Sequence, residues 1–95
     1  MSDRSAYVDK IEARLEQWDA EIDRLRARAQ EAGADAKIEY QQRADELQSR
    51  RDEARSELDR LKAAGTDAWD EVRSGFEKAW NRLSDAFEQT RSRSD

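Results

Sequence analysis

Apolar residues recur at alternating spacings of three and four over the first third of the chain, and this spacing constrains the fold more than any other feature. The run comprises Val8, Ile11, Leu15, Trp18, Ile22, Leu25, Ala29, Ala32 and Ala36, and the residues between them are mostly charged. Such spacing places one apolar stripe along a helix that is under-wound to about 3.5 residues per turn. The stripe predicts a helix that packs lengthwise against another helix.

A weaker stripe follows in the middle third of the chain. It comprises Tyr40, Ala44, Leu47, Arg51, Ala54, Leu58 and Leu61. Its spacing is again that of a coiled coil, but Arg51 and two alanines leave its centre poor in apolar volume. The phase slips between Ala36 and Tyr40, as in a stutter where a coiled coil locally unwinds.

The last third carries a short internal repeat with a period of 11 residues. In its two copies Trp69 matches Trp80, Val72 matches Leu83 and Phe76 matches Phe87. Eleven residues in three turns give about 3.67 residues per turn, so this stripe is nearly straight or slightly right-handed. It is the richest apolar face in the sequence.

Gly65 marks the clearest boundary between helices. It suits the left-handed conformation that often ends a helix. Thr66 is a candidate N-cap for the next helix, and Asp67, Asp70 and Glu71 fall where the helix dipole favours anions. From about residue 90 onward the sequence predicts a disordered tail.

The fold class is therefore all-α, in a single coiled-coil or helical-bundle domain over residues 1–95. Three amphipathic segments are expected, at about 5–32, 34–63 and 66–89, in an antiparallel coiled coil. Ala, Glu, Lys, Leu and Arg make up more than half of the chain, as is typical of such folds. Large aliphatic residues are few, a level at which disorder is the alternative, but disordered chains lack periodicity.

Gly33 decides between two architectures. A bend at Gly33 gives three helices that can close into a monomeric bundle. The flanking Ala32, Ala34 and Ala36 are helix formers, however, and one glycine costs a helix only about 1 kcal/mol. We therefore favour a continuous helix over 5–63, roughly 90 Å long at 1.5 Å per residue, which with helix 66–89 forms an antiparallel swapped dimer. Gly33 and Gly65 are the candidate hinges.

Composition excludes several kinds of chemistry. The chain has no Cys and no His, so thiol chemistry, the commonest metal ligand and the usual general base are absent. We expect no catalytic, cofactor-binding or metal-binding residues, and hence no enzyme and no cofactor. Nucleic-acid binding is not expected either, because the arginines are interleaved with acids and the net charge is −5.

No apolar run is long enough to cross a membrane, and the first residues lack a signal-peptide pattern, so a cytoplasmic protein is expected. The tryptophans leave an alternative open. Trp69 and Trp80 could belong to a lipid-facing stripe, since apolipoprotein-like proteins use 11-residue amphipathic repeats. The competing interpretation, which we favour, makes these residues core anchors, because they fall in the buried register. Basic residues do not dominate the chain, so an anionic membrane would not attract it.

Residues 7–10, 15–22, 34–40 and 67–80 resemble a family of small bacterial coiled-coil proteins that is linked by name to stress response, first in cyanobacteria. The Trp-containing segment is the most specific part of this resemblance. It implies a non-enzymatic bacterial protein associated with oxidative or salt stress, and it implies no catalytic residues. Gly33 departs from the family's usual helix former, which favours a bend at that position.

These observations predict a self-associating or protein-interacting coiled-coil protein, a homodimer, that is associated with stress. Its packing and oligomer interface is expected to comprise Val8, Ile11, Leu15, Trp18, Ile22, Leu25, Tyr40, Leu47, Leu58, Leu61, Trp69, Val72, Phe76, Trp80, Leu83 and Phe87. The alternative function is reversible binding to a lipid or membrane surface.

Overall fold

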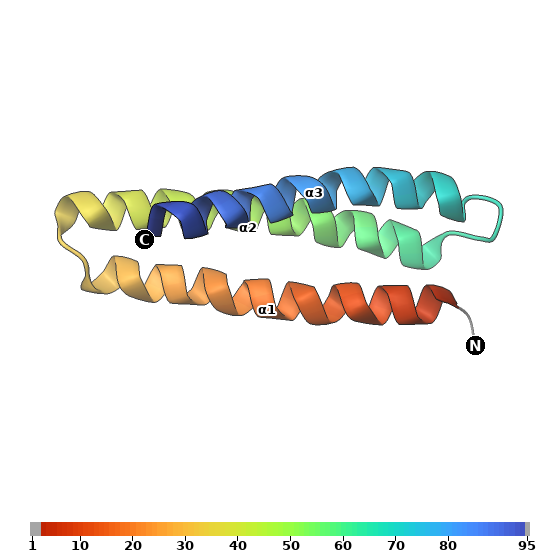
Figure 1. The fold of residues 1–95 in the computed structure, drawn as a ribbon, viewed down its shortest axis with the longest axis horizontal. Coiled ribbons are helices and arrows are strands. Elements are labelled where there is room, and N and C mark those ends of the chain that lie inside the picture. The colour runs from red at the N-terminus through yellow and green to blue at the C-terminus, as the bar shows by residue number, and fades with distance from the viewer. Residues whose placement is uncertain (1–2, 95) are drawn as a thin grey trace. The chain divides into compact units, whose positions relative to one another are not determined.

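The computed structural model describes residues 3–94, with side chains through residue 90, and these residues form three α-helices and no strand (Figure 1). Helix α1 spans Asp3–Glu31, α2 spans Ala34–Ala63 and α3 spans Trp69–Ser94. The all-α prediction and its three segments are confirmed. No helix of the described part of the chain is long and apolar enough to cross a membrane.

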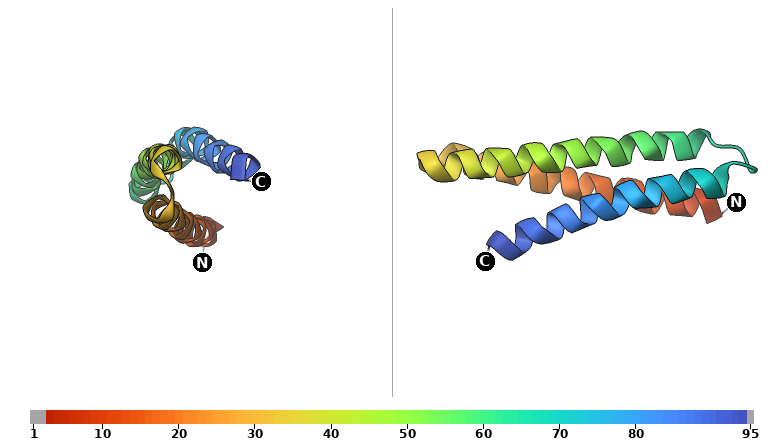
Figure 2. Two further views of the ribbon diagram at one scale, coloured as in Figure 1. Left: turned by 90° about the vertical axis from the view of Figure 1, so that its left-hand side faces the viewer. Right: turned by 90° about the horizontal axis from the view of Figure 1, so that it is seen from above.

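The chain divides into two compact units, and α2 runs from one into the other. The first unit ends at Ser49 and contains α1 and the first half of α2; we call it the N-terminal hairpin. The second begins at Arg50 and contains the rest of α2 and α3; we call it the C-terminal hairpin. In each hairpin two antiparallel helical arms are joined by a short linker, and Figure 2 shows both linkers from further directions.

The continuous helix favoured over 5–63 is wrong, because the structure breaks at Ala32 and Gly33. The carbonyl oxygen of Gly33 accepts a hydrogen bond of 2.8 Å from the Lys37 amide, which is the first α-helical bond of α2. Gly33 is therefore the N-cap of α2. Glycine is favoured over alanine at an N-cap and disfavoured inside a helix, and both preferences act in favour of the bend.

The break also changes the register of the neighbouring residues. Ala29 is buried and Ala32 is half-buried, as the heptad of α1 requires, but Ala36 is exposed. The predicted stripe fails at Ala36 because this residue belongs to α2, which starts with its own rotational phase. The phase slip expected between Ala36 and Tyr40 is in fact the start of a new helix.

The boundary predicted at Gly65 is confirmed, although its mechanism differs from the expectation. No glycine has a positive φ, so Gly65 is not left-handed. Instead the Ala64 amide donates to the Leu61 carbonyl at 3.2 Å, and the Ala68 amide donates to the Gly65 carbonyl at 3.1 Å. These i to i−3 bonds end α2 and form a turn, which delays the third helix from the expected residue 66 to Trp69.

The N-cap of α3 is Ala68 rather than Thr66, because the Val72 amide donates to the Ala68 carbonyl at 3.0 Å. Alanine has no side-chain oxygen to bond the free amides of the first turn. We expect Ala68→Ser to stabilise the protein by about 1 kcal/mol, measured by urea denaturation. Thr66→Ala is the matched control and should have little effect. A larger loss from Thr66→Ala than gain from Ala68→Ser would contradict this assignment.

At its C-terminal end, α3 continues beyond residue 89 and reaches Ser94. The region expected to be disordered from about residue 90 is thus helical through Ser94. The sequence contains no proline, and no glycine follows Gly75, so nothing in the backbone chemistry ends the helix sooner.

The interior of the described residues is entirely apolar. Its buried members are Ile11, Leu15, Trp18, Ile22, Leu25, Ala29, Ala44, Leu47, Ala54, Leu58, Leu61, Phe76, Ala79, Leu83 and Phe87, and residues 3–90 contain no buried polar residue. All of them except Ala79 follow the three predicted stripes. Four are alanines, which bury little surface each, so the core is thin for the length of the chain.

Gly75 lies inside α3, where glycine is the least favourable residue after proline. A Cβ at this position would lie 3.6 Å from Oε2 of Glu57, which is an ordinary contact distance. We therefore expect Gly75→Ala to stabilise the protein by about 1 kcal/mol, and to raise the Tm by roughly 4–8 °C for a domain of this size. Thermal melting by circular dichroism measures the change, and an unchanged or lower Tm would refute the expectation.

Candidate helix-packing interface

The predicted interface residues of α1 lie on one buried face. Ile11, Leu15, Trp18, Ile22 and Leu25 are all buried, and Val8 near the start of the helix is half-buried. The Trp18 ring is also covered by the Arg14 guanidinium, whose carbon lies 5.5 Å from the ring centroid. A cation over an indole face is attracted to its π electrons, so Arg14 shields the edge of this stripe from water.

In α2 the predicted stripe is buried at Leu47, Leu58 and Leu61, whereas Tyr40 is half-buried. The charged member of the stripe, Arg51, is also half-buried, and its guanidinium lies 3.3 Å from the Asp52 carboxylate. A long arginine stem can cover apolar surface while its charged end remains in water. This explains how a charged residue occupies a position where the heptad calls for an apolar one.

The stripe of α3 divides into buried and half-buried members. Phe76, Leu83 and Phe87 are buried, and Trp69, Val72 and Trp80 are half-buried. The rings of Phe76 and Trp80 are 5.5 Å apart and inclined by 34°, a favourable aromatic arrangement. Both tryptophans of the repeat thus lie at the edge of the apolar face rather than at its centre.

One buried member of α3 is missing from the predicted interface. Ala79 is buried, although the prediction gave this side of the helix to the larger Trp80. The spacing contained the signal, because Ala79 follows Phe76 by three residues and precedes Leu83 by four. Alanine is a weak marker of a buried position, because its side chain is small.

Within the N-terminal hairpin an ion pair links the two arms. Nη1 of Arg26 on α1 lies 3.2 Å from Oδ1 of Asp45 on α2. The two side chains are 42% and 73% exposed, so solvent screens their attraction and the pair adds little stability. The pair joins two arms that run antiparallel on either side of the linker (Figure 1).

Within the C-terminal hairpin the two arms come close at two positions along their length. Nη1 of Arg82 on α3 lies 3.9 Å from Oε2 of Glu53 on α2, and Gly75 lies against Glu57 one level closer to the loop. A methyl group at Gly75 would still fit here, since its Cβ would lie 3.6 Å from Oε2 of Glu57.

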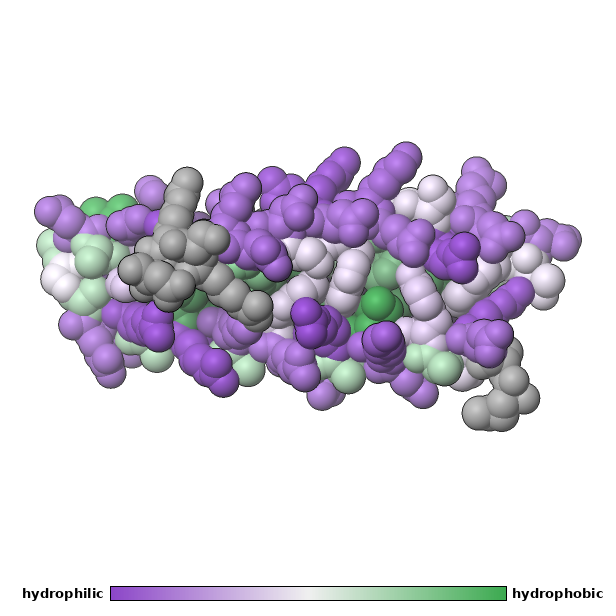
Figure 3. Space-filling view, in the orientation of Figure 1, coloured by the Kyte–Doolittle hydropathy of each residue, from purple (hydrophilic) through white to green (hydrophobic). Residues whose placement is uncertain are grey.

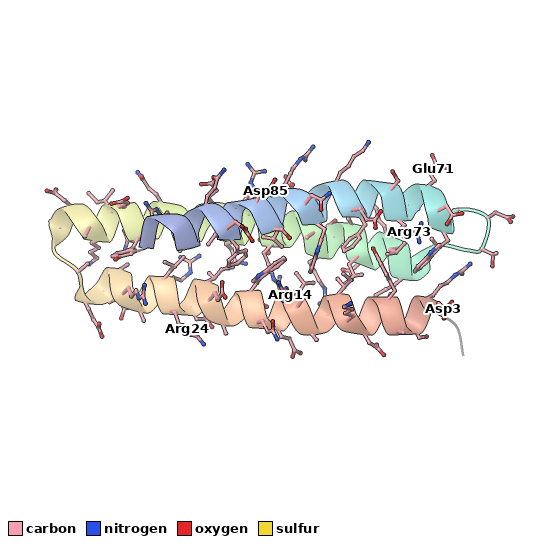
Figure 4. All side chains as sticks on the ribbon, in the orientation of Figure 1. Asp3, Arg14, Arg24, Glu71, Arg73 and Asp85 are labelled. Atoms are coloured by element: carbon pink, nitrogen blue, oxygen red, sulfur yellow. The ribbon has the colours of Figure 1, made fainter. Side chains whose placement is uncertain are left out.

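Hydrophilic residues cover most of the face shown in Figure 3, and many of the exposed residues are charged. Some of them pair along their own helix, including Arg43 with Glu39 at 2.6 Å and Arg55 with Asp59 at 3.5 Å. Others, such as Arg24 on α1 and Glu71 on α3, extend outward into solvent (Figure 4). Ile38, 57% exposed, is the one large apolar side chain exposed among residues 3–90, and single exposed apolar residues are ordinary.

The described residues offer few groups for chemistry. They contain no group of three or more Asp, Glu, His or Cys arranged to hold a metal ion. Every buried side-chain nitrogen or oxygen among them has a hydrogen-bond partner. Each of the three helices instead carries an apolar stripe that is buried in helix packing. No protein-family model, curated protein or solved structure matches this chain.

Proposed function

We propose that this chain is a non-enzymatic, self-associating coiled-coil protein whose working surface is the apolar stripe of its helices. The observation that carries the proposal is the interior of residues 3–90, which holds apolar side chains only. Binding or catalytic sites usually gather polar groups in a pocket, whereas an apolar stripe at heptad spacing serves helix packing.

A second copy of the chain is the proposed partner. The core contains four alanines among fifteen buried residues, and each alanine buries little area. A single copy therefore has a small margin over the entropy lost on folding. Association with a second copy supplies additional apolar burial where stripe members are only half-buried in one chain, as Val8, Val72 and Trp80 are. The resemblance to bacterial stress proteins supports a cytoplasmic protein that acts during oxidative or salt stress.

Light scattering after size exclusion, over a wide range of protein concentration, tests the proposal. We expect the mass to rise from one chain toward two as concentration increases. The helicity measured by circular dichroism should stay constant or rise over the same range. A monomer mass at every concentration would contradict self-association of the unmodified chain.

Reversible binding to a lipid surface is the second candidate function, and one observation favours it. Trp69 and Trp80 lie 11 residues apart in α3, and both are only half-buried. Indole rings favour the interface between lipid and water. Co-sedimentation with neutral and with anionic vesicles tests this function, and absence from both pellets would dismiss it.

A further inference from the structure

The linker between α1 and α2 consists of only two residues, Ala32 and Gly33. It joins a helix of 29 residues to one of 30 residues, and each helix carries an apolar stripe. A short linker between two long arms is the setting in which an arm can be exchanged between copies of a protein.

Nothing in the local geometry of Gly33 forces the bend. Its φ is not positive, and a Cβ built on it would meet no atom within 4 Å. Ala32 and Ala34 on either side have the highest helix propensity of any residue. The bent linker therefore rests on a weak local preference, namely that of glycine for an N-cap. Counting the backbone of these two residues alone, a continuous helix lies close to it in free energy.

We propose that the Ala32–Gly33 linker is a hinge that straightens into helix, and that α1 then packs on α2 of a second copy of this chain. This inference rests on the proposed self-association and specifies how it is controlled. Two copies exchange their α1 helices reciprocally, so each α1 stripe is buried as before. The balance between one chain and two is then set by the hinge and by protein concentration.

The Arg26–Asp45 pair distinguishes the two forms. In the bent form its two members belong to one chain and lie 3.2 Å apart. In a continuous helix these residues are 19 positions apart, or about 28 Å at 1.5 Å per residue. Arg26 can then reach only Asp45 of the second copy, so the same contact passes from within a chain to between chains.

Two substitutions at the hinge should shift the balance in opposite directions. Gly33→Ala favours the straight form by about fivefold per chain, hence roughly 25-fold in the association constant of a dimer that contains two hinges. Ala34→Pro places proline at the first position of α2, where it is tolerated, but inside the straight helix, where it disfavours that form by more than a hundredfold per chain. The concentration at which each variant dimerises is measured by light scattering.

Cross-linking provides a second readout. The chain contains no cysteine, so the double variant R26C/D45C carries two unique thiols that a short flexible bis-maleimide can join. With Ala34→Pro we expect a cross-linked monomer on a reducing gel. With Gly33→Ala, at concentrations where light scattering reports a dimer, we expect a cross-linked dimer. Circular dichroism verifies that each variant is helical before the comparison.

The possible outcomes distinguish the hinge proposal from the proposal that the natural chain self-associates. A dimer promoted by Gly33→Ala and abolished by Ala34→Pro supports the hinge. If Gly33→Ala dimerises while the unmodified chain stays a monomer, the hinge is supported and self-association of the natural chain is not. If all three proteins dimerise at the same concentration, or cross-linking of the dimer stays within chains, the hinge is overturned and association uses another surface.

Discussion

Trp18→Asp is expected to unfold the chain. The Trp18 side chain is 3% exposed at the centre of the α1 stripe. Truncating a buried tryptophan typically costs about 3–5 kcal/mol, and an unpaired carboxylate left in its place adds a desolvation penalty of several kcal/mol. Their sum is comparable to the whole stability of a small domain, about 5 kcal/mol at the lower end. Far-UV circular dichroism at 25 °C should show loss of most of the helical signal.

Ala20→Asp is the matched control for this prediction. Ala20 lies two residues further along α1 and is exposed, so the same new charge remains in water. Such surface changes usually alter the stability by no more than about 0.5 kcal/mol. If both variants kept the helical signal and urea midpoint of the original protein, Trp18 would not be part of a buried interface. Light scattering of Trp18→Asp also tests whether its stripe is needed for association.

Phe76→Ala is the second large effect. Phe76 is fully buried, with 0% of its surface exposed, and its ring packs against that of Trp80. Removing the ring loses its apolar burial and leaves a cavity, for a cost of about 3–5 kcal/mol. With a urea m-value on the order of 2 kcal/mol/M, the midpoint should fall by roughly 2 M.

Two further variants show whether this loss arises from the cavity. Phe76→Leu keeps most of the apolar volume and should cost clearly less than Phe76→Ala. Lys78→Ala, at an exposed position of the same helix, should leave the midpoint almost unchanged. Equal midpoints for Phe76→Ala and Lys78→Ala would mean that Phe76 does not anchor the C-terminal hairpin.

The helical class and the buried faces could be read from local patterns because side-chain periodicity reflects which face of a helix avoids water. The spacing from Ile11 to Leu25 identifies the buried face of α1, and the 11-residue repeat identifies that of α3. The Gly65 boundary was also readable, because no comparable break in helix formers occurs nearby. These features depend on residues close together in sequence, so the sequence determined them by itself.

The bend at Gly33, the capping at Ala68 and the exposure of Ala36 were decided by the tertiary structure. Locally, one glycine separates the bent and straight forms of the linker by only about 1 kcal/mol, but within one chain only the bent form buries the α1 stripe. Local preference is too weak to choose between them, so the packing of the arms about the linker decides. Once α2 starts at Ala34 its rotational phase is set by its own stripe, and this turns Ala36 toward solvent.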